Sequence, residues 1–204
     1  MKHSLTLVIL QKTPGGEIEV LVGMDGPNMT LIEIIVPENV TVKELANQAP
    51  QELGFRKNLE HKMIGIYDDP NDRPREKIGV TVAYVYQKSP EPENLKHPAY
   101  SFFAWIALDQ LRKNKMIRDH SKILEDSLKT TAEWCEKNRD NGHILLGDKF
   151  KLTDLFRIRK KLGSNEKAVG NFTRDILKEG QLRALKKDRT QTKGRPGVLY
   201  SLKG

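Results

Sequence analysis

The segment EKAVGNFTRDILKEGQLRALKKDRTQTKGRPGVLYSL, residues 166–202, decides how the last part of the chain folds. Its beginning has helical periodicity from about Glu166, and Gly180 is placed to end that helix. One face of the predicted helix is polar and basic, with four side chains within an arc of about 60° at 100° per residue: Lys167, Asn171, Arg174 and Lys178. The opposite face is apolar and carries Val169, Phe172 and Ile176. The helix therefore has one side for a core and one side for a polyanion.

A hairpin is predicted after this helix. Residues 182–185 form one short strand and residues 198–202 its partner. The connection between them is rich in basic residues: Lys186, Lys187, Arg189, Lys193 and Arg195. Upstream, Thr153 is expected to cap a helix that runs through Leu162. Two helices followed by a hairpin with a basic tip are the layout of a winged helix, which we predict for residues 148–204.

This layout predicts a double-stranded DNA interface. In a winged helix the second helix enters the major groove, and the wing contacts the backbone or the minor groove. Asn171 and Arg174 suit base readout, because Asn pairs with adenine and Arg with guanine. Phosphate contacts are expected from the second-helix lysines, from the hairpin cations and from two first-helix residues, Arg157 and Lys161. The alternatives are a charged face that is only solvated and a winged helix that binds protein; double-stranded RNA is disfavoured by its narrow major groove.

The basic excess of the chain is concentrated in the same segment. The 204 residues carry a net charge of +8, with 16 Lys and Arg against 6 Asp and Glu after residue 147. The preceding residues hold 19 basic and 21 acidic side chains. Such an asymmetry predicts a module for a polyanion joined to a module with a different task. A lysine-rich tail without a specific partner is the simpler alternative.

The first part of the chain is predicted to be α+β. Strands are expected at residues 5–10, 17–22, 30–36, 78–87 and 101–108. A helix is expected from Thr41 to about Leu53, with Glu44 as the capping-box partner of Thr41 and Gly54 after its end. Pro50 is expected to kink or break it. The predicted domain covers residues 1–115.

A long helix is predicted at about residues 120–138, within a linking region at 116–147. Leu124, Leu128, Thr131 and Cys135 lie on one face of it, so this helix is expected to join two domains or to pair across a dimer. The single cysteine excludes an internal disulfide and a multi-thiolate zinc site. The five histidines have no metal-ligand spacing, and no apolar run is long enough to span a membrane. A cytoplasmic location is the default expectation.

Several of these segments resemble the Nudix-related transcriptional regulators. The C-terminal matches are FKLTDL at 150–155, Asn171-Phe172, and GRPGVLY at 194–200. Asp119-His120 and LLGDKF at 145–150 are similar to the linking segment of that family, and YDDPNDRPR at 67–75 to a loop in its first domain. The resemblance covers about residues 60–204.

The resemblance implies a Nudix-like mixed-sheet sensor domain, a linking helix and a winged helix-turn-helix domain in a homodimer that binds a two-fold-related operator. The function implied is a DNA-binding regulator, with repression expected, controlled by a small metabolite such as ADP-ribose or a sugar. Asp72, Arg73 and Arg75 are candidate effector-binding residues, because Arg holds phosphate bidentately. A solvated loop with internal ion pairs is the equal alternative for these three residues.

The catalytic motif of Nudix hydrolases, G-x5-E-x7-R-E-U-x-E-E-x-G-U, is degenerate in this chain. When its end is aligned on Gly54 and Phe55, Glu52 is the only matched glutamate. One carboxylate is too little charge for the metal ions that activate water. We therefore predict no catalytic residue, no metal and no cofactor. Two alternatives remain: a divergent Nudix hydrolase of ADP-ribose or a related nucleoside diphosphate, and a dimeric DNA-binding protein without a ligand.

Overall fold

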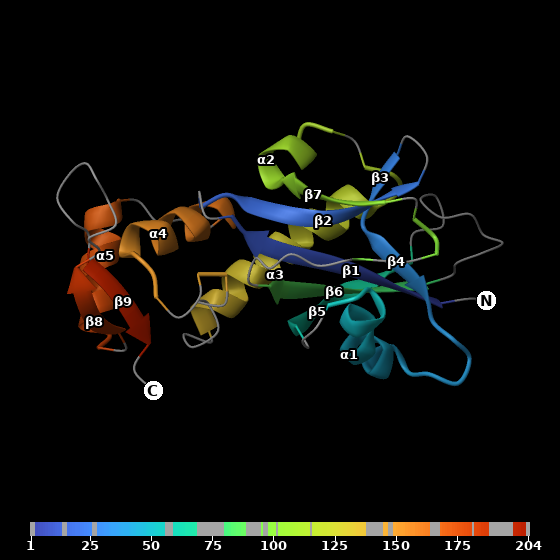
Figure 1. The fold of residues 1–204 in the computed structure, drawn as a ribbon, viewed down its shortest axis with the longest axis horizontal. Coiled ribbons are helices and arrows are strands. Elements are labelled where there is room, and N and C mark those ends of the chain that lie inside the picture. The colour runs from blue at the N-terminus through green and yellow to red at the C-terminus, as the bar shows by residue number, and fades with distance from the viewer. Residues whose placement is uncertain are drawn as a thin grey trace.

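The computed structural model describes residues 3–13, 16–25, 28–55, 59–68, 80–88, 95, 98–100, 102–114, 116–137, 145–146, 149–163, 168–180, 182–187 and 198–202. The strands are β1 (His3–Lys12), β2 (Ile18–Asp25), β3 (Asn28–Thr30), β4 (Ile32–Ile35), β5 (Glu60–Tyr67), β6 (Val80–Lys88), β7 (Phe103–Ala107), β8 (Leu182–Lys187) and β9 (Val198–Leu202). The helices are α1 (Val42–Glu52), α2 (Leu108–Leu111), α3 (His120–Lys137), α4 (Leu152–Lys161) and α5 (Val169–Lys178). Figure 1 shows a sheet region joined at one end to a smaller C-terminal module of α4, α5, β8 and β9.

Strand β1 is the centre of a mixed seven-stranded sheet. It pairs in parallel with β6 along nearly its whole length, from His3 opposite Val80 to Gln11 opposite Lys88. Its other edge is shared between two antiparallel partners, β4 and β2. Strands β3 and β7 extend the sheet on β2, and β5 extends it on β6. The mixed α+β architecture agrees with the sequence prediction.

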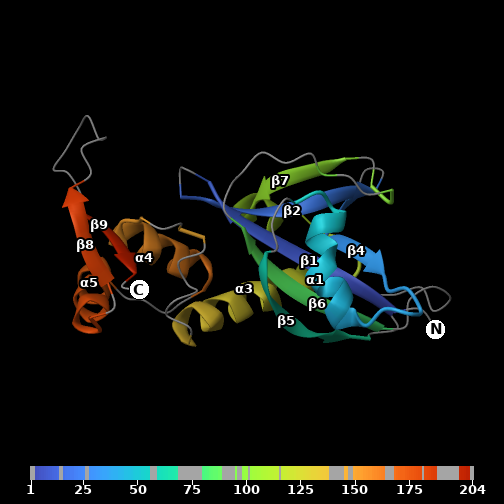
Figure 2. The same cartoon turned by 60° about the horizontal axis from the view of Figure 1, so that its bottom comes forward.

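Both faces of β1 are buried, and the side chains alternate between two cores. Leu5, Leu7 and Ile9 belong to the cluster packed under α1. Val8 and Leu10 belong to the other cluster, which continues through Leu124 and Leu128 of α3. Helix α3 packs against β5 and β6 and so covers one face of the sheet, while α1 covers the opposite face (Figure 2). A strand that is covered on both sides has a nearly continuous apolar sequence.

Helix α1 is set by local chemistry. The Thr41 side chain accepts a hydrogen bond from the Glu44 N–H, and the Glu44 carboxylate accepts one from the Thr41 N–H, which completes the predicted capping box. The hydrogen bonds that the Thr41 N–H and the Thr41 hydroxyl donate to the Glu44 carboxylate lower the pKa of Glu44. Gly54 follows the helix at φ 102°, a left-handed value. The expected break at Pro50 was wrong: Pro50 lies buried in the last turn and the helix continues to Glu52.

The Tyr100 ring lies in close contact with Gly23 of β2. A Cβ atom at Gly23 would lie 2.4 Å from Cδ1 of Tyr100, so this position accepts no side chain without movement of the ring. The Tyr100 hydroxyl accepts a hydrogen bond from the Glu33 N–H at 2.7 Å. The ring also packs on Phe103, with centroids 5.6 Å apart. Gly23 therefore allows Tyr100 to tie the segment before β7 to β4.

Gly23→Ala is expected to destabilise the protein by about 1–3 kcal/mol, because the added methyl group overpacks a rigid contact. Urea unfolding followed by circular dichroism measures this change. Gly65→Ala on β5 is the control, since a Cβ atom there comes no closer than 3.7 Å to Tyr67. Equal stability of Gly23→Ala and the unmodified protein would contradict the tight contact.

In the C-terminal module, α4 and α5 precede an antiparallel hairpin of β8 and β9. Phe150, just before α4, exchanges two backbone hydrogen bonds with Tyr200 of β9, at 3.0 and 2.8 Å. This bridge ties the start of the module to its end. Thr153 was wrongly predicted as the cap of α4: the N-cap is Lys151, two residues earlier, and it makes no side-chain cap. Thr153 lies exposed within the first turn.

Other boundaries also differ from the predictions. Strand β5 was not predicted, and the strand expected at residues 30–36 is divided at Leu31 into β3 and β4. Helix α5 begins at Val169 rather than near Glu166, and the Val169 side chain is 41% exposed rather than in the core. No helix in the described part of the chain has both the length and the apolar character needed to cross a bilayer.

Candidate functional site

Helix α5 presents polar side chains to solvent. Asn171, Arg174 and Lys178 are exposed, as the helical wheel predicted. The guanidinium of Arg174 donates to Asn171 Oδ1 and to Asp175 Oδ1, each at 3.4 Å. Phe172 is 3% exposed and anchors the helix from its opposite side. Asn171 and Arg174 therefore lie next to each other on the exposed face of α5, while Phe172 anchors the opposite face.

Helix α4 places cations around the aromatic pair that joins it to α5. Phe156 and Phe172 have ring centroids 5.5 Å apart. The Arg159 guanidinium lies over the Phe172 ring at 5.5 Å, and the Lys160 ammonium over the Phe156 ring at 5.6 Å. Such cation–π contacts hold long cationic side chains near the joint of the two helices. The exposed Arg157 has a long ion pair with Asp154, at 3.8 Å.

Lys161, the other α4 cation of the predicted interface, points towards the first part of the chain. Its ammonium contacts the Glu17 carboxylate and lies 3.6 Å from Asp109 Oδ2. Glu17 precedes β2 and Asp109 belongs to α2. The structure therefore places Lys161 apart from the α5 group.

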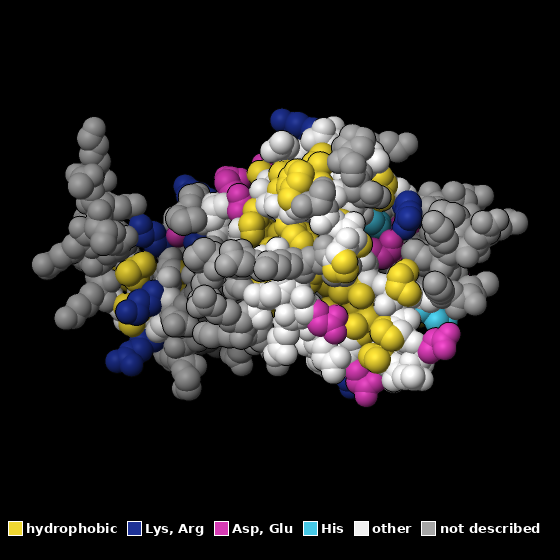
Figure 3. All heavy atoms as spheres, turned by 45° about the vertical axis from the view of Figure 1, so that its right-hand side comes forward, with side chains coloured by type: hydrophobic (Ala, Val, Ile, Leu, Met, Phe, Trp, Pro, Cys, Tyr) yellow, Lys and Arg dark blue, Asp and Glu magenta, His cyan; other side chains and the backbone are white. Residues whose placement is uncertain are grey.

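Two of the remaining predicted residues lie in the hairpin. Lys186 and Lys187 lie in β8, which is two residues longer than predicted. Lys167, Arg189, Lys193 and Arg195 lie outside the described residues, as do Asp72, Arg73 and Arg75. Arg183 of β8 is exposed, and neither it nor Lys160 was among the predicted contacts. Both residues lie close in the sequence to predicted cations, and this proximity could have placed them among the predicted DNA contacts. Lys and Arg side chains stand out at the module end of the molecule in Figure 3.

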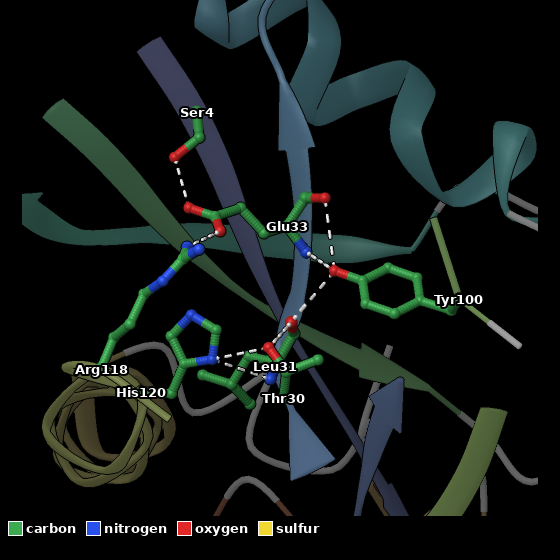
Figure 4. Close-up of polar contacts among 7 residues, drawn as sticks. All are labelled: Ser4, Thr30, Leu31, Glu33, Tyr100, Arg118 and His120. Atoms are coloured by element: carbon green, nitrogen blue, oxygen red, sulfur yellow. Dashed lines mark hydrogen bonds and ion pairs between the residues drawn. The ribbon is translucent and has the colours of Figure 1, made fainter. Parts of the chain in front are cut away.

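A buried polar junction joins the start of α3 to the sheet (Figure 4). His120 is 0% exposed, and its Nδ1 accepts a hydrogen bond from the Leu31 N–H at 3.1 Å. The Thr30 hydroxyl oxygen lies 2.9 Å from the same nitrogen. Since a main-chain N–H can only donate, Nδ1 acts as the acceptor and the ring proton lies on Nε2. His120 thus ties the start of α3 to the segment where β3 passes into β4.

Glu33 and Arg118 form the second part of this junction. The Glu33 carboxylate accepts hydrogen bonds from Ser4 Oγ at 2.7 Å and from Arg118 Nη1 at 2.6 Å. Arg118 has φ 52°, a left-handed conformation that is strained for a residue other than glycine. Figure 4 shows its side chain extended from the start of α3 towards β4. This ion pair and the His120 bonds fix where α3 begins.

A cavity of about 420 Å³ lies between β5 and α3. Its charged lining contains Asp68, Asp119, Lys122, Asp126, Lys129 and Glu133. Burial, together with the hydrogen bond that the Tyr67 hydroxyl donates to Asp126 at 2.9 Å, raises the pKa of Tyr67. With four carboxylates against two ammonium groups, this lining repels anions and suits hydroxyl groups that donate to carboxylates.

Helix α1 carries the positions aligned with the hydrolytic motif. Asn47, Gln48, Gln51 and Glu52 are exposed along it, and Asn47 donates to the Lys43 carbonyl oxygen at 2.9 Å. Figure 3 shows apolar side chains across the middle of the visible face, with separate acidic ones around them. Within the described ranges, no group of three or more His, Cys, Asp or Glu side chains is placed to hold a metal ion.

The sheet between α1 and α3 has a Nudix-like fold, and nearly the whole chain shares the fold of a Nudix-related regulator of known structure. The family resemblance predicted from the sequence is thereby confirmed as a similarity of fold. No protein-family model matches the sequence, and neither does any curated protein sequence.

The similar structures include NrtR from Shewanella oneidensis, with a TM-score of 0.71 at 16% identity over 98% of this chain and 94% of that one. The same protein in complex with a 27mer DNA gives a TM-score of 0.70 at 17% identity, over 98% and 93% of the two chains. Its NUDIX domain in complex with ADP ribose gives 0.54 at 15% identity, over 63% and 86%. A MutT/nudix family protein from Enterococcus faecalis gives 0.72 at 16% identity, over 99% and 86%.

Proposed function

We propose that this protein is a DNA-binding transcriptional regulator whose C-terminal module, residues 148–204, acts as a winged helix. The observation that carries the proposal is the exposed Asn171–Arg174 pair on α5. It stands on a helix anchored by Phe172, in a helix–helix–hairpin module that holds the basic excess of the chain. The module belongs to a fold shared along nearly the whole chain with a protein crystallised on DNA.

In this proposal α5 enters the major groove. Arg174 and Asn171 contact base edges, because guanine and adenine offer the acceptor and donor patterns that these side chains match. Phosphate contacts come from Arg157, Lys160, Lys178 and Arg183, which are exposed around α5, and from the predicted cations Lys167, Lys186, Lys187, Arg189, Lys193 and Arg195. Phosphate contacts set position and register and supply affinity, while α5 supplies sequence preference.

The proposed effector is a small metabolite, for which ADP-ribose is the first candidate because a NUDIX domain of similar fold was crystallised in complex with ADP ribose. The acidic cavity between β5 and α3 disfavours a diphosphate, so it is assigned to a hydroxyl-rich ligand such as a sugar. A diphosphate is instead assigned to the predicted Arg73 and Arg75, with Asp72 beside them. The protein is proposed to be a homodimer, since an operator with two-fold symmetry needs two α5 helices, one for each half-site. Its proposed effect on transcription is repression.

Hydrolysis is not proposed. Of the glutamates expected in the motif, Glu52 alone is present, and Glu44 is engaged in the capping box of α1. A metal-activated water needs several carboxylates to hold the cations that polarise it. The apolar and amide side chains of α1 supply no such charge.

Fluorescence anisotropy with labelled DNA from the upstream region of the gene, against a scrambled duplex, tests the proposal. Across a salt series we expect affinity for both duplexes to fall, because cations released from phosphates make binding salt-dependent. The native duplex is expected to bind at least about 1000-fold tighter than the scrambled one at every salt concentration. Equal binding to both duplexes would contradict specific regulation, and no binding would contradict the DNA interface itself.

A further inference from the structure

Three charged residues meet where α4 reaches the sheet region. The Lys161 ammonium contacts the Glu17 carboxylate and lies 3.6 Å from Asp109 Oδ2. The Lys161 side chain is 25% exposed, against 67% for Arg157 and 62% for Arg174. If Lys161 contacted DNA, its side chain would be expected to be as exposed as those of Arg157 and Arg174.

The ion pairs lie beside apolar packing that crosses the same junction. Each of the three charged residues has a neighbour in one continuous buried cluster. These neighbours are Ile18 beside Glu17, Leu108 beside Asp109, and Leu162 beside Lys161. Glu17 is itself held in place, since its N–H donates to Thr13 Oγ1 at 3.1 Å and its carbonyl oxygen accepts from the Thr13 N–H at 2.9 Å. Lys161 therefore reaches a preformed acidic edge next to a shared core.

The electrostatics oppose a DNA contact at this position. Two carboxylates flank one ammonium, so a phosphate brought to Lys161 would approach two negative charges at short range. We propose that Lys161 is a positioning residue that docks the C-terminal module on β2 and α2 through Glu17 and Asp109. Its consequence for operator binding rests on the proposed function: docking sets the direction in which α5 faces DNA.

Hydrogen exchange of the free protein tests the docking without any DNA. In Lys161→Met we expect amides at residues 16–18 and 111–114 to exchange about three- to tenfold faster, because the ion pairs that hold these two segments against α4 are lost. The neighbouring Lys160→Met is the matched control and is expected to leave both segments unchanged. Reversal of all three charges, Lys161→Glu with Glu17→Lys and Asp109→Lys, is expected to restore protection. Unchanged exchange in Lys161→Met would overturn the proposal.

The salt dependence of DNA binding separates docking from phosphate contact. Lys160→Met is expected to reduce the slope of log affinity against log salt by about 0.9 for each lost contact. Lys161→Met is expected to keep the slope of the unmodified protein, and a reduction equal to that of Lys160→Met would overturn the positioning role. If no variant binds DNA, the proposed function fails, whereas the exchange result still decides whether Lys161 docks the module.

Discussion

Arg174→Ala is expected to weaken binding to the native operator by about 1–3 kcal/mol, or roughly 5- to 150-fold, at fixed salt. The reason is geometric. Arg174 lies on the outer face of α5, where Asp175 and Asn171 each accept a 3.4 Å hydrogen bond from its guanidinium. The side chain remains 62% exposed, and the planar fork of donors on its guanidinium suits bidentate contact with one guanine. Alanine removes that contact together with one positive charge.

The loss of charge and the loss of base readout can be distinguished by a matched variant. Arg157→Ala removes the same charge from α4, where the guanidinium is exposed and only loosely paired with Asp154. We expect Arg157→Ala to weaken native and scrambled duplexes equally and Arg174→Ala to weaken mainly the native one. Anisotropy titrations of both duplexes at one salt concentration give the two ratios. If Arg174→Ala left the ratio of native to scrambled affinity intact, α5 would not be the reading helix.

His120→Ala is expected to lower the free energy of unfolding by about 3–5 kcal/mol. The change removes a fully buried ring, which opens a cavity, and it leaves the Leu31 N–H without the acceptor that now lies 3.1 Å away. The same bonds join the start of α3 to the junction of β3 and β4. Urea unfolding monitored by tryptophan fluorescence measures the change, with exposed His3→Ala as the control within about 0.5 kcal/mol of the unmodified protein.

Two further variants divide the expected loss into its causes. His120→Phe keeps a ring of similar size but removes the acceptor, so a loss of about 1–3 kcal/mol is expected from the unsatisfied donor alone. His120→Asn keeps an acceptor near the position of Nδ1 but removes much of the ring. If His120→Phe were as stable as the unmodified protein, the hydrogen bonds of the junction would contribute nothing measurable.

Features that depend on neighbours in the sequence were predictable. The capping box of α1 needs Thr41 and Glu44 three positions apart, and it forms as expected. The polar face of α5 follows from helical periodicity and also holds. The start of α4 was missed by two residues, because Thr153 had to be chosen over Lys151 on side-chain preference alone. The backbone begins the turn at Lys151 without any side-chain cap.

Features that depend on distant partners were not predictable from one sequence. Strand β5 begins with Glu60, His61 and Lys62 and is an edge strand, so its identity depends on pairing with β6. Lys161 was grouped with the DNA-binding residues because of its helix, while its partner Glu17 is 144 positions away. The hydrogen-bond partner of His120 is similarly remote, since Thr30 precedes it by 90 positions. These contacts form because the fold brings together segments that are far apart in the sequence.

The parallel pairing of β1 with β6 constrains the order of events during synthesis. His3 faces Val80 and Gln11 faces Lys88, so β1 gains this partner only after residue 88 has left the ribosome. Until then β1, which contains the apolar sequence LVIL, can pair with β2 and β4. Its other edge remains unpaired, and one apolar face of the strand remains uncovered. Contacts between residues that are so far apart in the sequence form slowly, and exposed strand edges of this kind promote aggregation. Expression at lower temperature, where synthesis and misassembly are both slower, is therefore expected to raise the yield of folded protein.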